Sequence, residues 1–368
     1  MTLATAALLK AGSTASRPDG DLTIVIGGKE IIGWQDVEVT LRAEGFPNSF
    51  AIGASAKHEI TDVARPGARC QVYLGGDLVI TGYLDRNVQG GGPVIHTLGL
   101  IGRGLTQDLV DCSAEWPSGQ MINGDALSIS QQIAQPYGIQ VALAEGAAAG
   151  PKLPGWLLNY GETGASIVQS VARNARLMAY ESAQGVLLLA KVGTGKAASG
   201  VRYGDNVQEW QVEQSADGRF SDYVCAYLPS NTAIDLTGPG DIFYHRETDP
   251  SVTRHRQLDF VLEAVASDTT PGEFTIARTQ WEAAQRAGRS TVVSTTIDSW
   301  RDADGKLWTP NTLVPVDLPG FPAADLILGE VTFRRSNETG TTASLVLMPA
   351  QAFTPEPLVL QPVPADLI

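Results

Sequence analysis

The chain has 368 residues, of which 40 are acidic and 26 basic, and its formal net charge is -14 at pH 7. Proteins that coat nucleic acid or bind an anionic membrane surface carry the opposite charge, so this composition argues against both classes. An apolar fraction of 43% is enough to supply a core for two or three domains of ordinary size. The 39 glycines and the low charged fraction of 18% favour a turn-rich, β-dominated fold.

The first part of the chain shows short strands separated by glycine turns, after a polar leader at residues 1–17. The segment LTIVIGGKEIIGW places two apolar runs around Gly27 and Gly28, which predicts a hairpin whose tight turn needs positive φ. Apolar and polar residues then alternate as in a half-buried strand. Residues 18–102 are therefore predicted to form an antiparallel β-barrel domain whose edges are closed or paired with a neighbouring subunit.

The next hundred residues change in character and predict an α/β insert at residues 103–204. Helical patterns occupy residues 103–111, 125–135 and 164–178. In the third, apolar side chains share one face and Thr163 is placed to cap the first turn.

A second β-barrel domain with one helix is predicted at residues 205–349. The helix spans residues 273–288 with Gly288 as its C-cap, and strands are expected at residues 290–299, 313–318, 325–335 and 342–348. An alternative is that residues 205–230 return to pair with the first barrel. No exact sequence repeat links the two β regions, so their similarity in fold is a hypothesis. Residues 350–368 are rich in proline and are expected to form an extended C-terminal arm.

Patterns for zinc and for a disulfide framework are missing from the sequence. His245 and His255 lack both the helical or short-loop spacing and the nearby cysteine that zinc sites use. Cys70, Cys112 and Cys225 are odd in number and far apart, which favours free thiols in a reducing compartment. We expect no metal site.

Two other cofactor motifs are incomplete. The segment GTGKAAS at residues 193–199 lacks the first glycine of a phosphate-binding loop and the Ser or Thr after its lysine. The acidic segment around Asp302 and Asp304 lacks the glutamate that closes a calcium loop, so a β-turn is the better interpretation. We expect no cofactor.

Acidic residues beside aromatic ones leave a catalytic alternative open. Glu115 with Trp116, Glu162, and Glu209 with Trp210 are pairings that a glycan hydrolase could use. Among 40 acidic residues such neighbours arise by chance, and no Gly-x-Ser-x-Gly elbow accompanies them. The sequence therefore assigns no catalytic residue.

An ordered series of segments resembles the baseplate hub proteins of phage Mu-like contractile tails. The longest block is RTQWEAAQRAGRSTVVSTTIDSWRDADGKLWTPNTLVPVDLP, at residues 278–319. The same family is suggested, in the same order, by LTIVIGGKEIIGW, TGYLD, IGRGLTQDLVDCSA, QPYGI, GETGASIVQSVARNARLMAY and DGRFSDYVCAYLP. The series covers nearly the whole chain, apart from the leader and the proline-rich end.

The resemblance implies a homotrimer in which each chain supplies two tube-like β domains, so that three chains make a pseudo-sixfold ring. Such a ring joins the sixfold tail tube, or its initiator protein, to the threefold central spike, and DNA passes through it without specific binding. The tape-measure protein and the baseplate wedge are further candidate partners. The implied location is the virion baseplate, after assembly in the host cytoplasm and without membrane insertion. No catalytic residue comes with the resemblance.

Four residues of the second β region are candidates for subunit contacts. Arg286 and Arg289 end the predicted helix, where an arginine compensates the helix dipole or forms an ion pair with a neighbour. Trp300 and Trp308 flank one turn, and packing inside the second barrel is their first interpretation, with a subunit contact second.

The proline-rich arm is a candidate for docking on the spike. Its candidate residues are Pro355, Pro357, Leu358, Leu360 and Pro362. Prolines reduce the entropy lost when an extended segment is ordered on a partner.

Two functional alternatives follow from these observations. One is the tail-associated glycan hydrolase described above. The other is the hub portion of a secretion-system spike, which combines hub domains with a β-helical needle. If the hub interpretation holds, the residues that face the channel should be acidic or neutral in sum, because neutralising phosphates is what makes DNA adhere.

Overall fold

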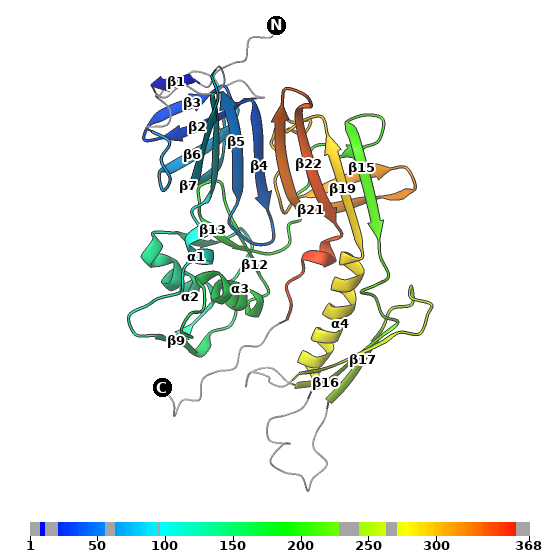
Figure 1. Cartoon of the computed structure of the whole chain (residues 1–368). Helices are drawn as coiled ribbons and strands as arrows, with labels where there is room; N and C mark the ends of the chain where they lie inside the picture. Colours follow the sequence, from blue (N-terminus) through cyan, green and yellow to red (C-terminus); the bar gives the residue numbers. More distant parts are fainter. Residues whose placement is uncertain are drawn as a thin grey trace.

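The structure is a computed structural model, and it describes residues 8–11, 21–55, 63–93, 96–227, 243–262 and 271–357. Strands dominate it, with one long sheet at one end and two mixed units at the other (Figure 1). Within the described part of the chain, no helix has the length and apolar character needed to cross a membrane.

The first β region begins with a hairpin and continues as a curved antiparallel sheet. Its strands are β1 (Leu8–Ala11), β2 (Leu22–Ile26), β3 (Lys29–Ile32), β4 (Asp36–Arg42), β5 (Ser49–Ser55), β6 (Arg69–Leu74), β7 (Asp77–Gly91) and β8 (His96–Gly104). Gly27 and Gly28 adopt φ values of 57° and 77°, so the β2–β3 turn has the conformation that its sequence predicts.

The insert follows β8 as a compact α/β unit. Its elements are α1 (Gln107–Asp111), β9 (Gln120–Gly124), α2 (Ala126–Ala134), the 3₁₀ turn η2 (Gln135–Tyr137), β10 (Val141–Leu143), β11 (Leu153–Leu157), α3 (Gly164–Asn174), β12 (Met178–Glu181) and β13 (Leu187–Ala190). All three predicted helices form, but α1 starts later than predicted, because residues 103 and 104 belong to β8, and α3 ends at Asn174, before Met178 begins β12. The Thr163 hydroxyl accepts from the Ser166 amide as the N-cap of α3. Buried residues of the helices and strands form a core that is separate from that of the long sheet.

The second β region carries the remaining strands and the longest helix. Its elements are β14 (Val201–Arg202), β15 (Val207–Gln214), β16 (Asp222–Tyr227), β17 (Phe243–Thr248), β18 (Gln257–Leu262), α4 (Pro271–Arg289), β19 (Thr291–Ile297), β20 (Leu313–Leu318), β21 (Phe321–Ser336), β22 (Gly340–Met348) and the 3₁₀ turn η3 (Ala350–Phe353). The helix and the four strands predicted after residue 270 all form.

One pairing joins the two β regions edge to edge. Strand β4 pairs antiparallel with β21, so the described strands run in a single path, β1-β3-β2-β6-β7-β8-β5-β4-β21-β22-β19-β15. The buried side chains of both regions form one hydrophobic cluster beneath this path. The two β regions are therefore parts of one packed body (Figure 1).

Each β region contains the same five-stranded repeat. In space the strand orders are β6-β7-β8-β5-β4 and β20-β21-β22-β19-β15, and along the chain β4 to β8 correspond to β15 and then β19 to β22. Both long strands bulge at the same place, between Leu84 and Arg86 in β7 and between Leu328 and Glu330 in β21. The hypothesis of two halves with similar folds is thus confirmed by strand connectivity.

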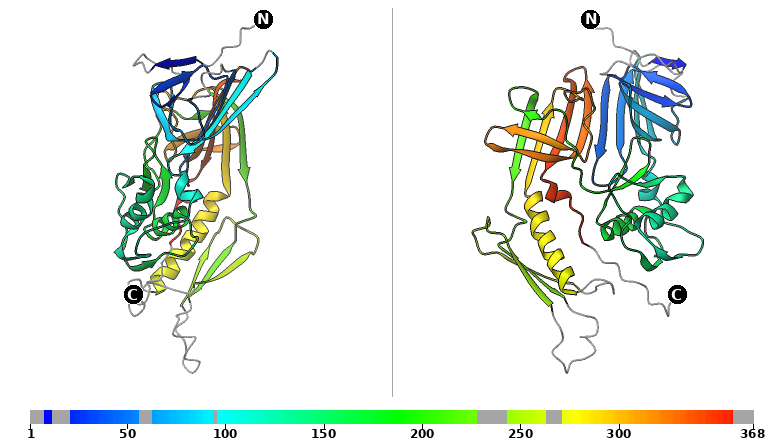
Figure 2. Two further views of the ribbon diagram at one scale, coloured as in Figure 1. Left: turned by 60° about the vertical axis from the view of Figure 1, so that its left-hand side comes forward. Right: turned by 180° about the vertical axis from the view of Figure 1, so that it is seen from behind.

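The second repeat is interrupted by an inserted segment, here called the α4 unit. Where the first repeat connects β4 to β5 through residues 43–48, the second runs from β15 to β19 through residues 215–290. The α4 unit contains α4 and a small sheet of order β17-β16-β18, whose central strand packs on this helix. The insert and this unit lie at the same end of the long sheet in both views of Figure 2.

The alternative pairing considered for residues 205–230 is wrong for residues 205–227, and residues 228–230 lie outside the described residues. Strand β15 pairs with β19 at the far edge of the second repeat, and β16 pairs with β17 and β18. Neither strand contacts the first β region by pairing, because the position beside β4 is occupied by β21.

Candidate assembly surfaces

The long sheet has one face on the core and one face of mainly small and polar side chains, here called the polar face. Because side chains alternate along a strand, the cross-strand registers assign residues to this face. Its charged members are Asp36, Glu38, Arg42, Arg86, Arg103, Glu209, Glu213, Glu330 and Arg334, five carboxylates against four guanidinium groups. The polar face is therefore acidic in sum.

Side-chain contacts on the polar face connect the paired strands β4 and β21, whose pairing is here called the β4–β21 joint. Arg42 binds Glu330 at 2.8 Å and Arg334 binds Glu38 at 3.2 Å, each across the two strands. Between these ion pairs the hydroxyl oxygens of Thr40 and Thr332 lie 3.0 Å apart. Exposed ion pairs add little stability singly, so these contacts mainly fix which residues stand opposite one another.

Two edges of the sheet path have no strand beside them in the described residues. Strand β15 pairs only with β19, and its Trp210 is 39% exposed, with the Tyr203 ring packed edge-on at 6.5 Å. The second half of β7 pairs only with β8, and its Val88 is 54% exposed. Unpaired strand edges with exposed apolar side chains are typical of surfaces that another chain covers.

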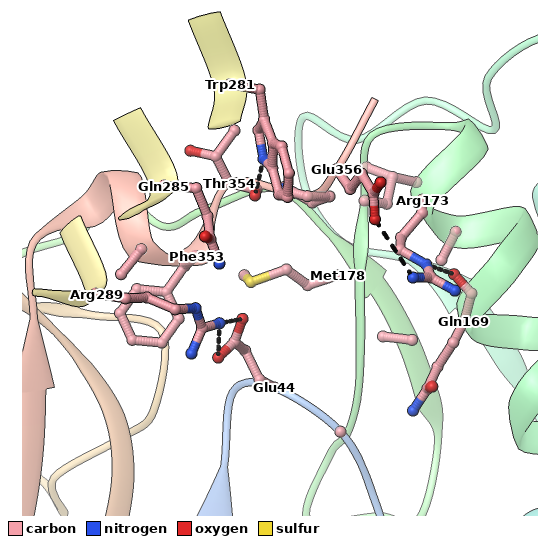
Figure 3. Close-up of a pocket in the computed structure, with 16 residues that line it drawn as sticks. Glu44, Gln169, Arg173, Met178, Trp281, Gln285, Arg289, Phe353, Thr354 and Glu356 are labelled. Atoms are coloured by element: carbon pink, nitrogen blue, oxygen red, sulfur yellow. Dashed lines mark hydrogen bonds and ion pairs between the residues drawn. The ribbon is translucent and has the colours of Figure 1, made fainter. Parts of the chain in front are cut away.

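A pocket of about 420 Å³ lies where the first repeat, the insert, α4 and the C-terminal segment meet (Figure 3). On one side Arg289 donates to both carboxylate oxygens of Glu44, at 2.6 and 2.8 Å. On the other side Glu356 lies 3.7 Å from Arg173 of α3 and 2.9 Å from Arg278 of α4. The pocket is thus bounded by contacts that hold four parts of the chain together.

The C-terminal segment is packed against its own subunit as far as Pro357. Phe353 is 1% exposed, Pro357 is buried, and the Trp281 indole donates to the Thr354 carbonyl at 2.7 Å. Gly288 lies inside the last turn of α4, where a Cβ would be 2.4 Å from the Ala352 nitrogen. Its role as a C-cap, predicted from the sequence, is wrong: the glycine is needed for close approach of the segment.

The candidate arm therefore divides in two. Pro355 and Pro357 belong to the packed segment, and burial of Pro357 removes it from any docking surface. Leu358, Leu360 and Pro362 lie outside the described residues.

The two candidate arginines are engaged within the chain. Arg286 forms an ion pair with Glu282, one helical turn earlier, at 2.6 Å and also donates to the Gly218 carbonyl at 3.1 Å. Burial by itself would raise the pKa of Glu282, but hydrogen bonds from Arg278 and Arg286 outweigh burial, and the pKa lies below its ordinary value. Arg289 reaches Glu44, a partner far away in sequence that no local pattern could have indicated.

The two candidate tryptophans lie in the core of the second repeat. Each is 2% exposed. The Trp300 indole donates to the carbonyls of Arg334 at 3.0 Å and Thr342 at 2.9 Å, and that of Trp308 donates to the Ser299 carbonyl at 3.1 Å. Packing inside the subunit, the first interpretation of both residues, is what the geometry shows, and it leaves neither ring surface for a neighbouring chain.

Sequence reasoning missed a buried carboxylate at the boundary between the first repeat and the insert. Glu181 is 4% exposed, and its two oxygens accept from the backbone amides of Asn48 and Thr106, each at 3.0 Å. Gly104 makes room for it, since a Cβ there would lie 1.8 Å from a carboxylate oxygen. Burial raises the pKa of Glu181 to about 7, against the lowering effect of the amide donors.

The acid–aromatic pairs do not converge on one cleft. Glu115 and Trp116 line a pocket of the insert, whereas Glu209 and Trp210 lie on β15 of the second repeat. Glu162 hydrogen-bonds to Asn159 and Ser166 beside α3. In the described ranges, no three His, Cys, Asp or Glu side chains are grouped so that they could hold a metal ion.

Comparison with known domain families matches three separate stretches of the chain. Residues 21–104 match the N-terminal domain of the Mu phage baseplate assembly protein GpP-like family. Residues 106–191 match the second domain of the baseplate hub protein gp44-like family, and residues 272–356 match the fourth domain of the Mu phage baseplate assembly protein GpP. The matched stretches follow the first repeat, the insert, and α4 with the rest of the second repeat.

The similar proteins are a phage baseplate hub protein and two tail proteins. The chain is 27% identical over 346 residues to the baseplate hub protein gp44 of Escherichia phage Mu, covering 90% of this chain and 88% of that protein. The crystal structure of the 43 kDa tail protein of prophage MuSo2 from Shewanella oneidensis superimposes with a TM-score of 0.78 at 26% identity, covering 91% of this chain and 99% of that one. A tail protein from Neisseria meningitidis MC58 gives a TM-score of 0.73 at 23% identity, covering 93% and 99%.

The secretion-system alternative is supported only by the fold. A type VI secretion component of E. coli, described as similar to the phage T4 tail proteins gp27 and gp5, has a TM-score of 0.54 at 10% identity, with 93% of this chain and 76% of that one covered. Identity this low indicates shared architecture and not a shared role.

The raised pKa of Glu181 gives a testable pH dependence. The folded pKa is raised from 4.5 to about 7, so the contribution of this group to stability is fully present below about pH 4.5 and is lost as pH rises through about 7. Glu181→Gln should remove this dependence. Between pH 5 and 8 the free energy of unfolding of the wild type should therefore fall relative to the variant, by up to about 3 kcal/mol.

Urea unfolding at several pH values measures that difference. Glu338→Gln, at an exposed turn, is the control for loss of a carboxylate. If Glu181→Gln and the wild type keep a constant stability difference over this range, the buried carboxylate does not titrate as described.

Proposed function

Because the chain belongs to the phage Mu-like baseplate hub proteins, we propose that three copies of it close into a ring of six similar β units. The observation that carries the proposal is the internal repeat. Each chain places two five-stranded units side by side and already joins them through β4 and β21. Closed symmetry requires the remaining edge of one chain to meet the remaining edge of the next.

The family assigns the general role. The chain is a structural component of the tail baseplate of a Mu-like phage, and it is not an enzyme. The glycan-hydrolase alternative is therefore wrong, in keeping with acid–aromatic pairs that lie on different parts of the structure.

The proposed ring acts as an adapter. Six β units in one plane match a sixfold tail tube or its initiator protein, whereas three chains match a threefold central spike. The insert and the α4 unit both leave the sheet at the same end, so one rim of the ring would carry these domains and the other would carry strand ends (Figure 2). The tape-measure protein and baseplate wedge are further partners of this hub, which assembles in the host cytoplasm before joining the virion.

The polar face is proposed to line the DNA channel. It faces away from the core and is acidic in sum, with exposed carboxylates at Asp36, Glu38, Glu209 and Glu213. A wall of this sign releases no counterions from DNA and so gives the passing duplex no affinity. The net charge of the whole chain, -14, has the same sign.

Reversing charge on the polar face should create DNA binding. Asp36 and Glu209 are both exposed and occupy corresponding positions of the two repeats, opposite Gly53 and Thr296. The double variant Asp36→Lys, Glu209→Lys should bind duplex DNA with an affinity that falls steeply with salt, whereas the wild type should not retain DNA at about 0.15 M salt. Filter binding across a salt series measures this.

The matched control makes the same change of charge elsewhere. Glu145 and Asp304 are exposed and lie off the polar face, in the insert and in a turn after β19. Equal DNA binding by Glu145→Lys, Asp304→Lys would contradict the assignment of the polar face to the channel.

The chain beyond Pro357 is proposed to contact the spike. The described C-terminal segment runs from η3 through the pocket between α4 and α3, which places Pro357, its last described residue, at the rim that carries the insert and the α4 unit. Docking there would use an arm whose prolines limit the entropy lost on ordering.

Removing residues 358–368 should weaken co-purification of the spike protein while leaving the mass of the hub assembly unchanged. Glu356→Gln is the control, because it weakens the ion pairs with Arg278 and Arg173 but keeps the full length of the arm. Spike recovery equal to that of the full chain would overturn the docking proposal.

A further inference from the structure

We propose that β15 of one copy pairs antiparallel with the second half of β7 of the next copy, with Glu213 opposite Val88 of the partner. This inference rests on the proposed ring and specifies the joint that closes it. It follows from the correspondence between the two repeats, which fixes both the strands and their register.

The correspondence holds residue by residue in the long strands. Asp77 begins β7 as Phe321 begins β21, and the two bulges place Arg86 in correspondence with Glu330. Val88 therefore corresponds to Thr332. The cross-strand pairs can be followed from β7 through β8 and β5 to β4, and from β21 through β22 and β19 to β15. Residues that occupy the same place in the two series correspond, which makes Glu213 of β15 the counterpart of Thr40 of β4.

Backbone hydrogen bonds beside the bulges support this alignment. The Leu84 amide donates to the carbonyl of residue 68, and the Leu84 carbonyl accepts from the amide of residue 67. Leu328 makes the same two hydrogen bonds, with the carbonyl of residue 312 and the amide of residue 311. Gly67 and Asn311 share a positive φ, 83° and 64°. Strands β7 and β21 thus have the same backbone partners as far as their bulges. Beyond the bulge β21 pairs with β4, whereas the second half of β7 has no described strand on that side.

The joint inside the chain supplies the template for the joint between chains. In β4–β21, Thr40 stands opposite Thr332 and Val39 opposite Phe333. Replacing each strand by its counterpart places Glu213 opposite Val88, Val212 opposite Gln89, Gln211 opposite Gly90 and Trp210 opposite Gly91. All of these positions lie on the two unpaired edges.

The side chains fit this register. Gly90 and Gly91 carry no side chain, and the indole of Trp210 would lie over the glycine backbone of the next copy, an arrangement that protects an edge glycine. Arg86 and Glu213 become diagonal neighbours on the polar face, within reach for opposite charges. Val88, 54% exposed in the single chain, would be covered.

The two edges also have the backbone groups that pairing needs. In β4 the Ala43 amide, next to Arg42, donates to the Gly329 carbonyl across the joint at 2.8 Å. Its counterpart is the amide of Ala216, and the counterpart of Gly329 is Asp85 of β7. We therefore expect an intersubunit hydrogen bond from the Ala216 amide to the Asp85 carbonyl.

An engineered disulfide tests the pairing in the full-length chain. In a background with Cys112 replaced by Ala, since Cys70 and Cys225 are buried, the pair Val88→Cys, Glu213→Cys should oxidise to a covalent trimer. The template supports the geometry, because the Thr40 and Thr332 side chains at the equivalent position touch. Denaturing gel electrophoresis without reductant measures the product.

The control pair Val88→Cys, Gln211→Cys lies on the same face and would be brought together only by a two-residue shift of register. It should remain largely unlinked. A trimer by native mass that yields no link with Glu213→Cys, or links better with Gln211→Cys, would overturn this pairing while leaving the ring intact. A chain that stays monomeric would overturn the ring as well.

A charge swap gives a second readout that does not depend on oxidation. Arg86→Glu should raise several-fold the concentration at which the trimer half-dissociates, because it places like charges at the joint. Combining it with Glu213→Arg should restore the wild-type value. Failure of the combined variant to recover, with both single variants folded by circular dichroism, would contradict the diagonal placement of these residues.

Discussion

The antiparallel pairing of β4 with β21 is the constraint on which the rest of the structure depends. It joins strands nearly 300 residues apart in sequence, as the Thr40–Thr332 contact shows. Through it the two repeats share one core and one polar face. Because each repeat uses one edge for this joint, each chain keeps one unpaired edge on β15 and one on β7, which is the condition for a closed ring.

The elements outside the sheet are held by a small number of specific contacts. Glu181 attaches the insert to the end of the first repeat through the Asn48 and Thr106 amides. Arg289 attaches the end of α4 to the β4–β5 connection at Glu44. The C-terminal segment then binds α4 and α3 together through Glu356. These contacts fix the insert and the α4 unit at the same end of the long sheet.

Local sequence patterns predicted much of the fold because they act within one element. Alternation identified the strand at residues 313–318, and apolar periodicity with Thr163 identified α3. They did not predict the β4–β21 joint, because the residue pattern of a strand does not indicate which distant strand it pairs with. The same limit explains why Arg289 was a candidate for a neighbouring chain: its partner Glu44 lies 245 residues away. Glu181 was missed because a single acid in a short strand looks solvent-exposed until the packing of Gly104 is known.

The number of chains in the assembled hub tests the central claim most directly. Two repeats per chain with one free edge at each end allow closure into a ring, and the family resemblance implies that the ring holds three chains. The proposed assembly therefore has a mass three times that of the 38.9 kDa chain. Native mass spectrometry of the purified full-length protein measures this. A species of that mass is the predicted result, whereas a monomer at high protein concentration, or an assembly with another number of chains, would contradict the account.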